Sequence, residues 1–319
     1  MHTIGTVELW AVFGAIVLIA LVIDFLVLKV SGSHKVSFRE AALWSVAWIG
    51  LALAFNLGLW WWLDQQSGRA VANDIALEFL TGYVVEKALA IDNIFVFLLI
   101  FTRFRVSAEL QQRALMIGIL GAIALRAILI LVGAALIARF HWILYLFGVF
   151  LIYTGIKMAR APNDEADFES NPLMRWMRRH LRLTDRYHGT ALSVVDNGVR
   201  YFTPMFVVMA LIAVTDVIFA VDSIPAIFAI TEDPFIVLTS NVFAVLGLRA
   251  LFFLLAGMAD RFHLLNYGLA ATLIFIGIKM MIVDVWKVPV GLSLAVVALC
   301  IGTSMVASHL VRRREQHGA

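Results

Sequence analysis

The chain has 319 residues, of which 62% are hydrophobic and only 15% are charged, with a formal net charge of +3. A soluble domain has roughly 45–50% apolar residues, so this composition excludes an ordinary soluble protein and predicts one that crosses a lipid bilayer many times. The one cysteine, Cys300, excludes a disulfide within the chain. We expect no nucleic-acid partner.

Nine apolar stretches are long enough to be membrane spans, which need about 20 residues each. The first follows a terminus without Lys or Arg, and no small-residue cleavage site comes soon after it, so we interpret it as a transmembrane helix and not a removable signal peptide. In chain order the predicted spans are Leu9–Leu28, Ala42–Leu63, Ala76–Phe101, Ala114–Ile137, Trp142–Met158, Phe202–Ile230, Phe235–Met258, Leu264–Val283 and Val290–Val311.

Lys and Arg gather in alternate connecting segments, at residues 29–39, 103–113, 157–200 and 312–314. Positive charge marks the cytoplasmic side of a membrane protein. We therefore predict an N-terminus outside the cell and a C-terminus in the cytoplasm, as nine spans require. The long segment after the fifth span is predicted to be a cytoplasmic linker, with an amphipathic surface helix over Leu173–Leu183 that lies against anionic headgroups.

Two parts of the chain repeat each other in order. Glu86 and Asp92 correspond to Asp216 and Asp222, the segment 125–127 (LRA) recurs at 248–250, and the segment 155–157 (GIK) recurs at 277–279. Each unit holds three spans, an odd number, so the second must enter the membrane from the opposite side. Inverted repeats of this kind are typical of secondary transporters, which bind substrate near the midplane where the repeats meet.

The predicted fold is an all-α polytopic membrane protein with nine transmembrane helices and an inverted repeat of two three-helix units. We divide the chain into two N-terminal transmembrane helices (1–75), repeat 1 (76–159), a cytoplasmic linker (160–200), the inverted repeat 2 (201–284), and a last helix with a basic cytoplasmic tail (285–319).

Each repeat places two carboxylates six residues apart inside an apolar span: Glu86 with Asp92, and Asp216 with Asp222. A carboxylate at the bilayer centre costs roughly 2.5–3.5 kcal/mol, so four of them predict an ion or proton site. Residues six apart on a helix differ by about 120° and about 9 Å, and such a pair cannot grip one ion. Either the helix breaks near the acids, as Pro225 indicates for the second pair, or the acids of the two repeats share a site.

The candidate ligands all offer oxygen. They are Glu86, Asp92, Asn93, Asp216, Asp222 and Ser223. Such a set suits Mg²⁺, Ca²⁺ or Mn²⁺, and the lack of a nearby His or Cys argues against a zinc-type site. Clustered acids repel one another, which favours protonation of at least one and gives a basis for exchanging a divalent cation for protons. No nucleophile–base pair accompanies the acids, so we expect neither an enzyme nor a bound cofactor.

Structural roles compete with these interpretations. Glu86 could pair with Lys87 or with another basic group, and the aspartates could form hydrogen bonds between helices. Arg126 and Arg249, which match across the repeats, could neutralise the acids or snorkel to an interface. Asp24, near the end of its span, is expected at a membrane interface.

At these residues the chain resembles the TerC family of integral membrane proteins. The resemblance rests on the segments 86–97 (EKALAIDNIFVF), 216–226 (DVIFAVDSIPA), 241–250 (NVFAVLGLRA) and 277–280 (GIKM). It implies a manganese exporter in the bacterial inner membrane, protective against excess Mn²⁺ and linked to alkaline pH.

One position departs from the family pattern, which has a glutamate three residues before Asp216. This chain has Ala213 there. Residues three apart lie only about 60° apart around a helix, so a glutamate at 213 would face the same cavity as Asp216. We therefore expect weaker metal binding than in an Ala213→Glu variant.

The sequence thus predicts a secondary transporter that exports Mn²⁺ in exchange for protons, with the oligomeric state left open. One alternative is an exporter of another cation or of a basic amino acid, whose ammonium group the acids would bind. Another is a non-transporting membrane factor that assists insertion or metallation of other proteins. A transporter needs acids that face a cavity, whereas an insertion factor would expose a polar groove to lipid.

Overall fold

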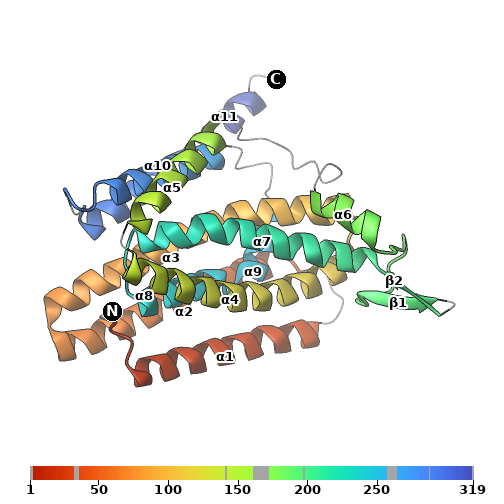
Figure 1. Cartoon of the computed structure of the whole chain (residues 1–319), viewed down its shortest axis with the longest axis horizontal. Coiled ribbons are helices and arrows are strands. Elements are labelled where there is room, and N and C mark those ends of the chain that lie inside the picture. Colours follow the sequence, from red (N-terminus) through yellow and green to blue (C-terminus); the bar gives the residue numbers. More distant parts are fainter. Residues whose placement is uncertain are drawn as a thin grey trace.

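The computed structural model describes residues 3–31, 36–140, 142–160, 172–196, 198–256, 264–286 and 288–317. These residues form a bundle of helices with one small β-hairpin (Figure 1). The elements are α1 (Val7–Ser31), α2 (Phe38–Ser67), α3 (Arg69–Arg103), α4 (Ala108–Arg139), α5 (Ile143–Arg160), α6 (Pro172–His180), β1 (Ser193–Asp196), β2 (Val199–Phe202), α7 (Pro204–Phe228), α8 (Pro234–Val245), α9 (Leu248–Ala256), α10 (Leu265–Met281) and α11 (Val290–His317).

Every predicted span overlaps a helix or a bent pair of helices. By length and composition, six helices in the described part of the chain can cross a membrane, namely α1, α2, α4, α5, α7 and α11, and the bent pair α8–α9 makes a seventh. Helix α10 is apolar but shorter, and α3, although 35 residues long, carries several charges. The helical membrane bundle is therefore confirmed, while nine spans and the inverted repeat stay predictions.

The predicted span Phe235–Met258 is bent. Helices α8 and α9 meet at 41°, and Gly247 between them has a φ of +80°, in the left-handed region that favours glycine. A Cβ at this position would stand 2.6 Å from ring atoms of Trp48 on α2. The bend was missed because the apolar run continues through it without a polar residue.

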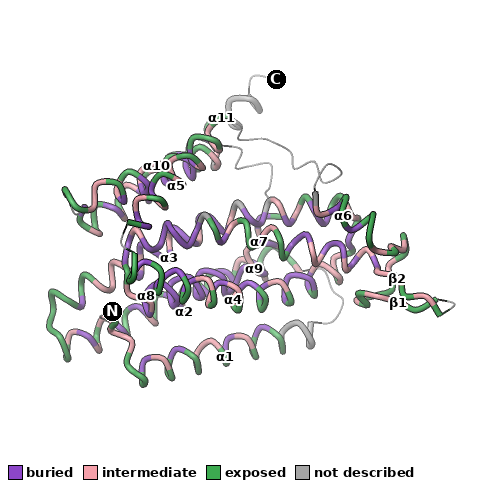
Figure 2. Tube along the Cα trace, in the orientation of Figure 1, coloured by how far each residue is buried: buried purple, intermediate pink, exposed green. Residues whose placement is uncertain are grey.

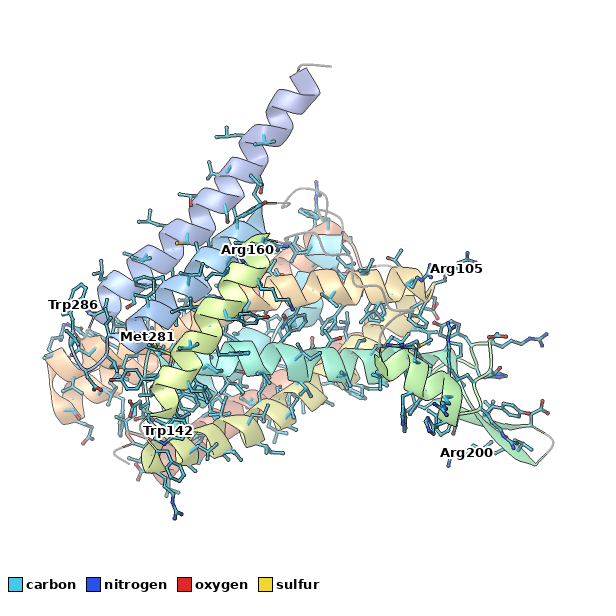
Figure 3. The ribbon with its side chains drawn as sticks, turned by 45° about the horizontal axis from the view of Figure 1, so that its top comes forward. Arg105, Trp142, Arg160, Arg200, Met281 and Trp286 are labelled. Atoms are coloured by element: carbon cyan, nitrogen blue, oxygen red, sulfur yellow. The ribbon has the colours of Figure 1, made fainter. Side chains whose placement is uncertain are left out.

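Helix α3 lies at the centre of the bundle. It contacts α2, α7, α8, α9 and α11, and Figure 2 shows the buried positions concentrated along α3 and its neighbours. Helices α5 and α10 pack along each other beside α11 at one end of the bundle, where they contact α3 and α7 (Figures 1 and 3). Glu86 of α3 and Asp216 of α7 therefore lie inside protein and not on its surface.

The linker contains the predicted surface helix, found as α6, and a hairpin of β1 and β2 that was not predicted. Met174 and Met177 of α6 are buried against the bundle. The hydroxyl of Tyr187 donates a hydrogen bond to the carbonyl oxygen of Phe104 at 2.8 Å, and partial burial raises the pKa of that hydroxyl. These contacts hold the described part of the linker against the end of α3.

Candidate functional site

Three charged side chains from three helices meet inside the bundle: Glu86 on α3, Arg126 on α4 and Asp216 on α7. Their exposed fractions are 0%, 1% and 7%. The Arg126 guanidinium forms a salt bridge with Glu86 and another with Asp216, where Nη2 and Oδ1 are 3.4 Å apart. It also donates to Oδ1 of Asn241 on α8 at 3.3 Å. One arginine thus joins acids from both predicted repeats.

Helix α7 carries its acids without a break. It begins after Thr203, whose side chain accepts a hydrogen bond from the backbone N–H of Phe206, and it continues through Pro225 to Phe228. The expectation that Pro225 breaks this helix is therefore wrong. Proline removes one backbone hydrogen bond, but neighbouring helices allow it inside a membrane helix. The interpretation in which Arg126 neutralises the acids is observed for Glu86 and Asp216, and an ion site shared by the two repeats stays a prediction.

Several buried polar atoms on the helices that meet at Arg126 have no hydrogen-bond partner among the described residues. They are Oε2 of Glu86, Oδ2 of Asp216, Oγ of Ser223, Nδ2 of Asn241 and Nε of Arg126 itself. Leaving such an atom unpaired costs about 1–3 kcal/mol. The cluster therefore has oxygen atoms that Arg126 does not use.

The predicted ligands differ in what the structure says of them. Glu86 and Asp216 are brought together, whereas Asn93 and Ser223 are buried on α3 and α7. The side chains of Asp92 and Asp222 lie outside the described part of the structure. No group of three His, Cys, Asp or Glu side chains that could hold a metal converges within the described part. The six-residue ligand set thus remains a prediction.

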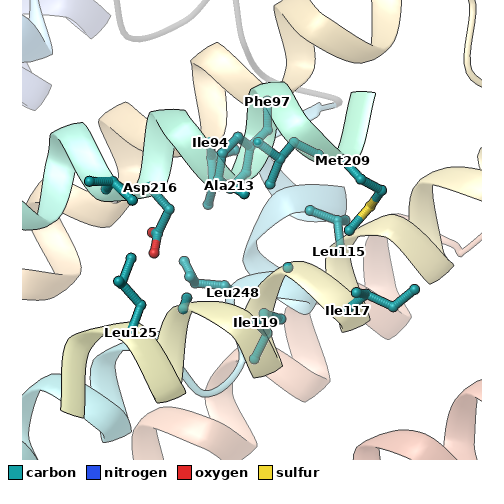
Figure 4. A pocket seen from close by; sticks show the side chains of 15 residues that line it. Ile94, Phe97, Leu115, Ile117, Ile119, Leu125, Met209, Ala213, Asp216 and Leu248 are labelled. Carbon is teal, nitrogen blue, oxygen red and sulfur yellow. The ribbon is translucent and has the colours of Figure 1, made fainter. Parts of the chain in front are cut away.

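A cavity of about 340 Å³ opens beside Asp216, between α3, α4 and α7. Figure 4 shows the Asp216 carboxylate pointing from α7 into this space, with Leu125 opposite on α4. Ala213 lines the same cavity, so the prediction that positions 213 and 216 face one cavity is confirmed. The remaining lining is apolar apart from this single acid.

A second cavity, of about 280 Å³, lies towards the other ends of α3 and α7. Its polar lining residues are Glu78, Thr231, Glu232 and Lys279. Glu78 is eight residues before Glu86 on α3, whereas the first cavity is lined by Ile94, eight residues after it. The charged cluster therefore lies between two cavities.

Arg249, the predicted mate of Arg126, has a different partner. Its Nη2 lies 2.6 Å from Oδ1 of Asp24 on α1 and 3.4 Å from the carbonyl oxygen of the same residue. Both side chains are buried. The interpretation of Asp24 as an interfacial acid missed this ion pair, because the partner lies 225 residues away in sequence.

Lys87 faces the end of α8 and not its neighbour Glu86. Its Nζ donates to the carbonyl oxygens of Ala244 at 3.0 Å and Leu246 at 3.3 Å. These carbonyls lie where the bend at Gly247 interrupts the helix, and lysine commonly satisfies such orphan acceptors. The alternative in which Glu86 forms an ion pair is thus observed, with Arg126 and not with Lys87 as the partner.

A bundle of apolar helices with an ionisable centre built from several of them defines a multi-pass integral membrane protein. The chain belongs to the TerC family: the model described as "Integral membrane protein TerC family" matches residues 71–316.

Three relatives illustrate the similarity. A protein of Shigella flexneri is 55% identical over 297 residues, which cover 93% of each chain. One of Photorhabdus laumondii is 49% identical over 313 residues, 98% of each chain. Both carry the provisional name membrane-bound redox modulator Alx. An uncharacterized membrane protein of Myxococcus xanthus is 46% identical over 312 residues, 98% of this chain and 95% of the relative. No solved structure matches the chain.

Proposed function

We propose that this chain is a secondary transporter that exports Mn²⁺ from the cytoplasm across the bacterial inner membrane in exchange for protons. One observation carries the proposal. Glu86 and Asp216, from helices of the two predicted repeats, both contact Arg126 in the buried centre of a membrane bundle beside a cavity. Acids in such a place are costly and mark ion pathways.

The donor atoms support a hard divalent cation as the cargo. The unpaired oxygens of Glu86, Asp216 and Ser223 lie on α3 and α7, the helices that also carry Asp92 and Asp222. Carboxylate, amide and hydroxyl oxygens suit Mn²⁺ better than softer metals. No enzymatic step is part of the proposal.

We also propose that the two three-helix units form an inverted pair, with the N-terminus outside and the C-terminus in the cytoplasm. The packing of α5 on α10 supports this. A Cβ on Gly148 would stand 3.0 Å from the carbonyl oxygen of Gly277, and one on Gly155 would stand 2.8 Å from that of Ala270. The offset that aligns Gly155 with Gly277 also aligns Gly148 with Ala270. The two contacts therefore exchange under the repeat, as contacts across a two-fold axis do.

The name of the relatives speaks of redox modulation. A single cysteine leaves this chain without an internal dithiol, which is the usual basis of disulfide exchange. A transporter that sets the supply of a redox-active metal ion would change redox balance indirectly, so the proposal accommodates that name.

A basic amino acid is a second candidate cargo, because the first cavity has apolar walls and one acid, Asp216. The aliphatic part of lysine could lie along these walls with its ammonium at the carboxylate. An insertion factor fits less well, since Glu86 and Arg126 are buried in protein and the cavity beside Asp216 has apolar walls and not those of a polar groove.

The test is flux of Mn²⁺, Ca²⁺ and lysine into or out of proteoliposomes that contain the full chain. Removing even a partner of a metal ligand costs about 10–100-fold, so we expect Asp216→Asn and Glu86→Gln each to lower Mn²⁺ flux at least about 100-fold. Asp222→Ala and Asp92→Ala should do the same. Mn²⁺ flux that survives these substitutions would overturn the proposed site, and lysine flux alone would support the second candidate.

A further inference from the structure

Arg126 lies at the point that separates the two cavities. Along α3, Glu78, Glu86 and Ile94 follow one another at eight-residue intervals, about 12 Å each. Glu78 lines one cavity and Ile94 the other. The guanidinium reaches from α4 to the acid between them. An ion that moved from one cavity to the other along α3 would pass the level of this arginine.

The guanidinium also occupies the place that a bound cation needs. It contacts oxygens of Glu86, Asp216 and Asn241, from three helices, at the same time. A guanidinium has N–H donors and no acceptor, so it gives these oxygens what a cation would give them. The second oxygens of both acids stay without a partner among the described side chains, and a metal ion could use them.

We propose that Arg126 is a tethered cation that holds the two carboxylates when no cargo is present, and that a divalent cation must displace it to bind. The inference rests on the proposed transport function. Without the arginine, two acids would be buried and uncompensated, which is strongly destabilising. With Arg126 present, the two acids have a buried counter-ion even when no cargo is bound.

This arrangement favours a divalent over a monovalent cargo. Two carboxylates and one guanidinium carry a formal charge of −1. A monovalent cation has the same charge as the arginine but must compete with a group that the chain holds at high effective concentration. A divalent cation interacts with the same two acids with twice the charge.

Displacement would also release the helices from one another. Arg126 ties α4 to α3, α7 and α8 through Glu86, Asp216 and Asn241. Binding of the cargo and loosening of the contact between the repeats then become one event. A cargo can shift a conformational equilibrium only through such a difference in contacts between its states.

The experiment compares Mn²⁺ binding to the purified full chain, measured by titration and by metal-dependent thermal stabilisation, with Mn²⁺ flux in proteoliposomes. If Arg126 holds the acids in about nine of ten molecules, Arg126→Gln lowers the Kd for Mn²⁺ about tenfold. We expect the KM for flux to fall with it, and the maximal rate to fall because Mn²⁺ leaves slowly. Arg249→Gln is the matched control, since it removes a buried arginine that pairs with Asp24, and its Kd should stay unchanged.

Two further measurements keep the test decisive if Arg126→Gln folds poorly. Arg126→Lys keeps the charge but loses the fork of donors, so its Kd should fall by a smaller factor. Millimolar guanidinium should raise the Kd of Arg126→Gln but not that of the parent chain, because the free ion re-enters the vacated place. An unchanged or weaker Mn²⁺ affinity in folded Arg126→Gln and Arg126→Lys overturns the displacement model alone. Failure of the parent chain to bind or move Mn²⁺ overturns the proposed function, and the displacement model with it.

Discussion

Arg126 and Arg249 stand at matching positions of the two predicted repeats, yet they do different things. Arg126 joins acids on α3 and α7, both inside the repeats. Arg249 pairs with Asp24 on α1, outside them. The same Leu-Arg-Ala segment thus serves once as a central link between the repeats and once as an anchor for the N-terminal helix. The two halves of the molecule are therefore not equivalent around the site.

The backbone around the two arginines also differs. Helix α4 is continuous through Arg126, whereas the bend at Gly247 comes two residues before Arg249. Because of the bend, α9 runs in a different direction from α8 and packs against α2. Trp48 of α2 fills the space at Gly247. A difference in backbone accompanies the difference in partners.

The largest effect on this comparison should come from Arg249→Gln. It leaves the buried Asp24 without its counter-ion, and breaking a buried pair costs about 3–5 kcal/mol. A denaturant titration of the detergent-solubilised chain measures the free energy of unfolding. The double variant Asp24→Asn with Arg249→Gln should recover most of the loss. A loss below about 1 kcal/mol, the range of surface ion pairs, would show that the pair is not an anchor.

A second test of the difference between the two regions is Gly247→Ala, because alanine disfavours the backbone conformation on which the bend depends. The left-handed backbone and the close ring of Trp48 together should lower the free energy of unfolding by about 2–4 kcal/mol. Gly58→Ala on α2 is the control, because a Cβ there meets nothing within 4 Å and the substitution should be neutral or stabilising. Equal stability of Gly247→Ala and Gly58→Ala would contradict the role given to the bend.

Lys87→Met tests the residue that links the two regions, since Lys87 follows Glu86 on α3 and binds the end of α8. Losing its hydrogen bonds to Ala244 and Leu246 should destabilise the chain by about 1.5–3 kcal/mol. Amide hydrogen exchange should become faster around residues 246–249. The exposed Lys157 provides the control, as Lys157→Met should change neither quantity.

The smallest expected effect is on Mn²⁺ affinity, and it tests whether position 213 contributes to the site around Arg126. Ala213→Glu adds a carboxylate to the wall of the cavity that Asp216 lines. We expect Mn²⁺ to bind about tenfold more tightly, which corresponds to ~1.4 kcal/mol. Ala213→Gln, of similar size and without charge, should show little of this gain. Equal transport by Ala213→Glu and the parent chain would exclude position 213 as a ligand.

Much of the fold could be predicted, because apolar length and helical spacing are local properties of a sequence. The spans followed from runs of apolar residues, and the shared cavity of Ala213 and Asp216 followed from their spacing on one helix. Neutralisation of acids by Arg126 was one of the interpretations of its place in an apolar span, and it is found for Glu86 and Asp216. The side chains of Asp92 and Asp222 lie outside the described residues, so their role as metal ligands stays a prediction.

What the sequence could not show depends on contacts between distant residues. The bend at Gly247 packs closely against Trp48 of another helix, and the sequence is apolar both before and after the bend. The pairing of Arg249 with Asp24 spans 225 positions. Matching arginines predict matching partners, and only the packed helices reveal that the partners differ.

The glycines between α5 and α10 have a consequence for how the two units can evolve. Each close contact takes one residue from each unit, and the nearest atoms to a new methyl group on Gly148 or Gly277 include the backbone of the other helix. No change of rotamer relieves a clash with backbone, so a substitution on one of these helices disturbs both. Along this seam the two predicted units must change together, whereas their arginines, each with partners of its own, are free to specialise.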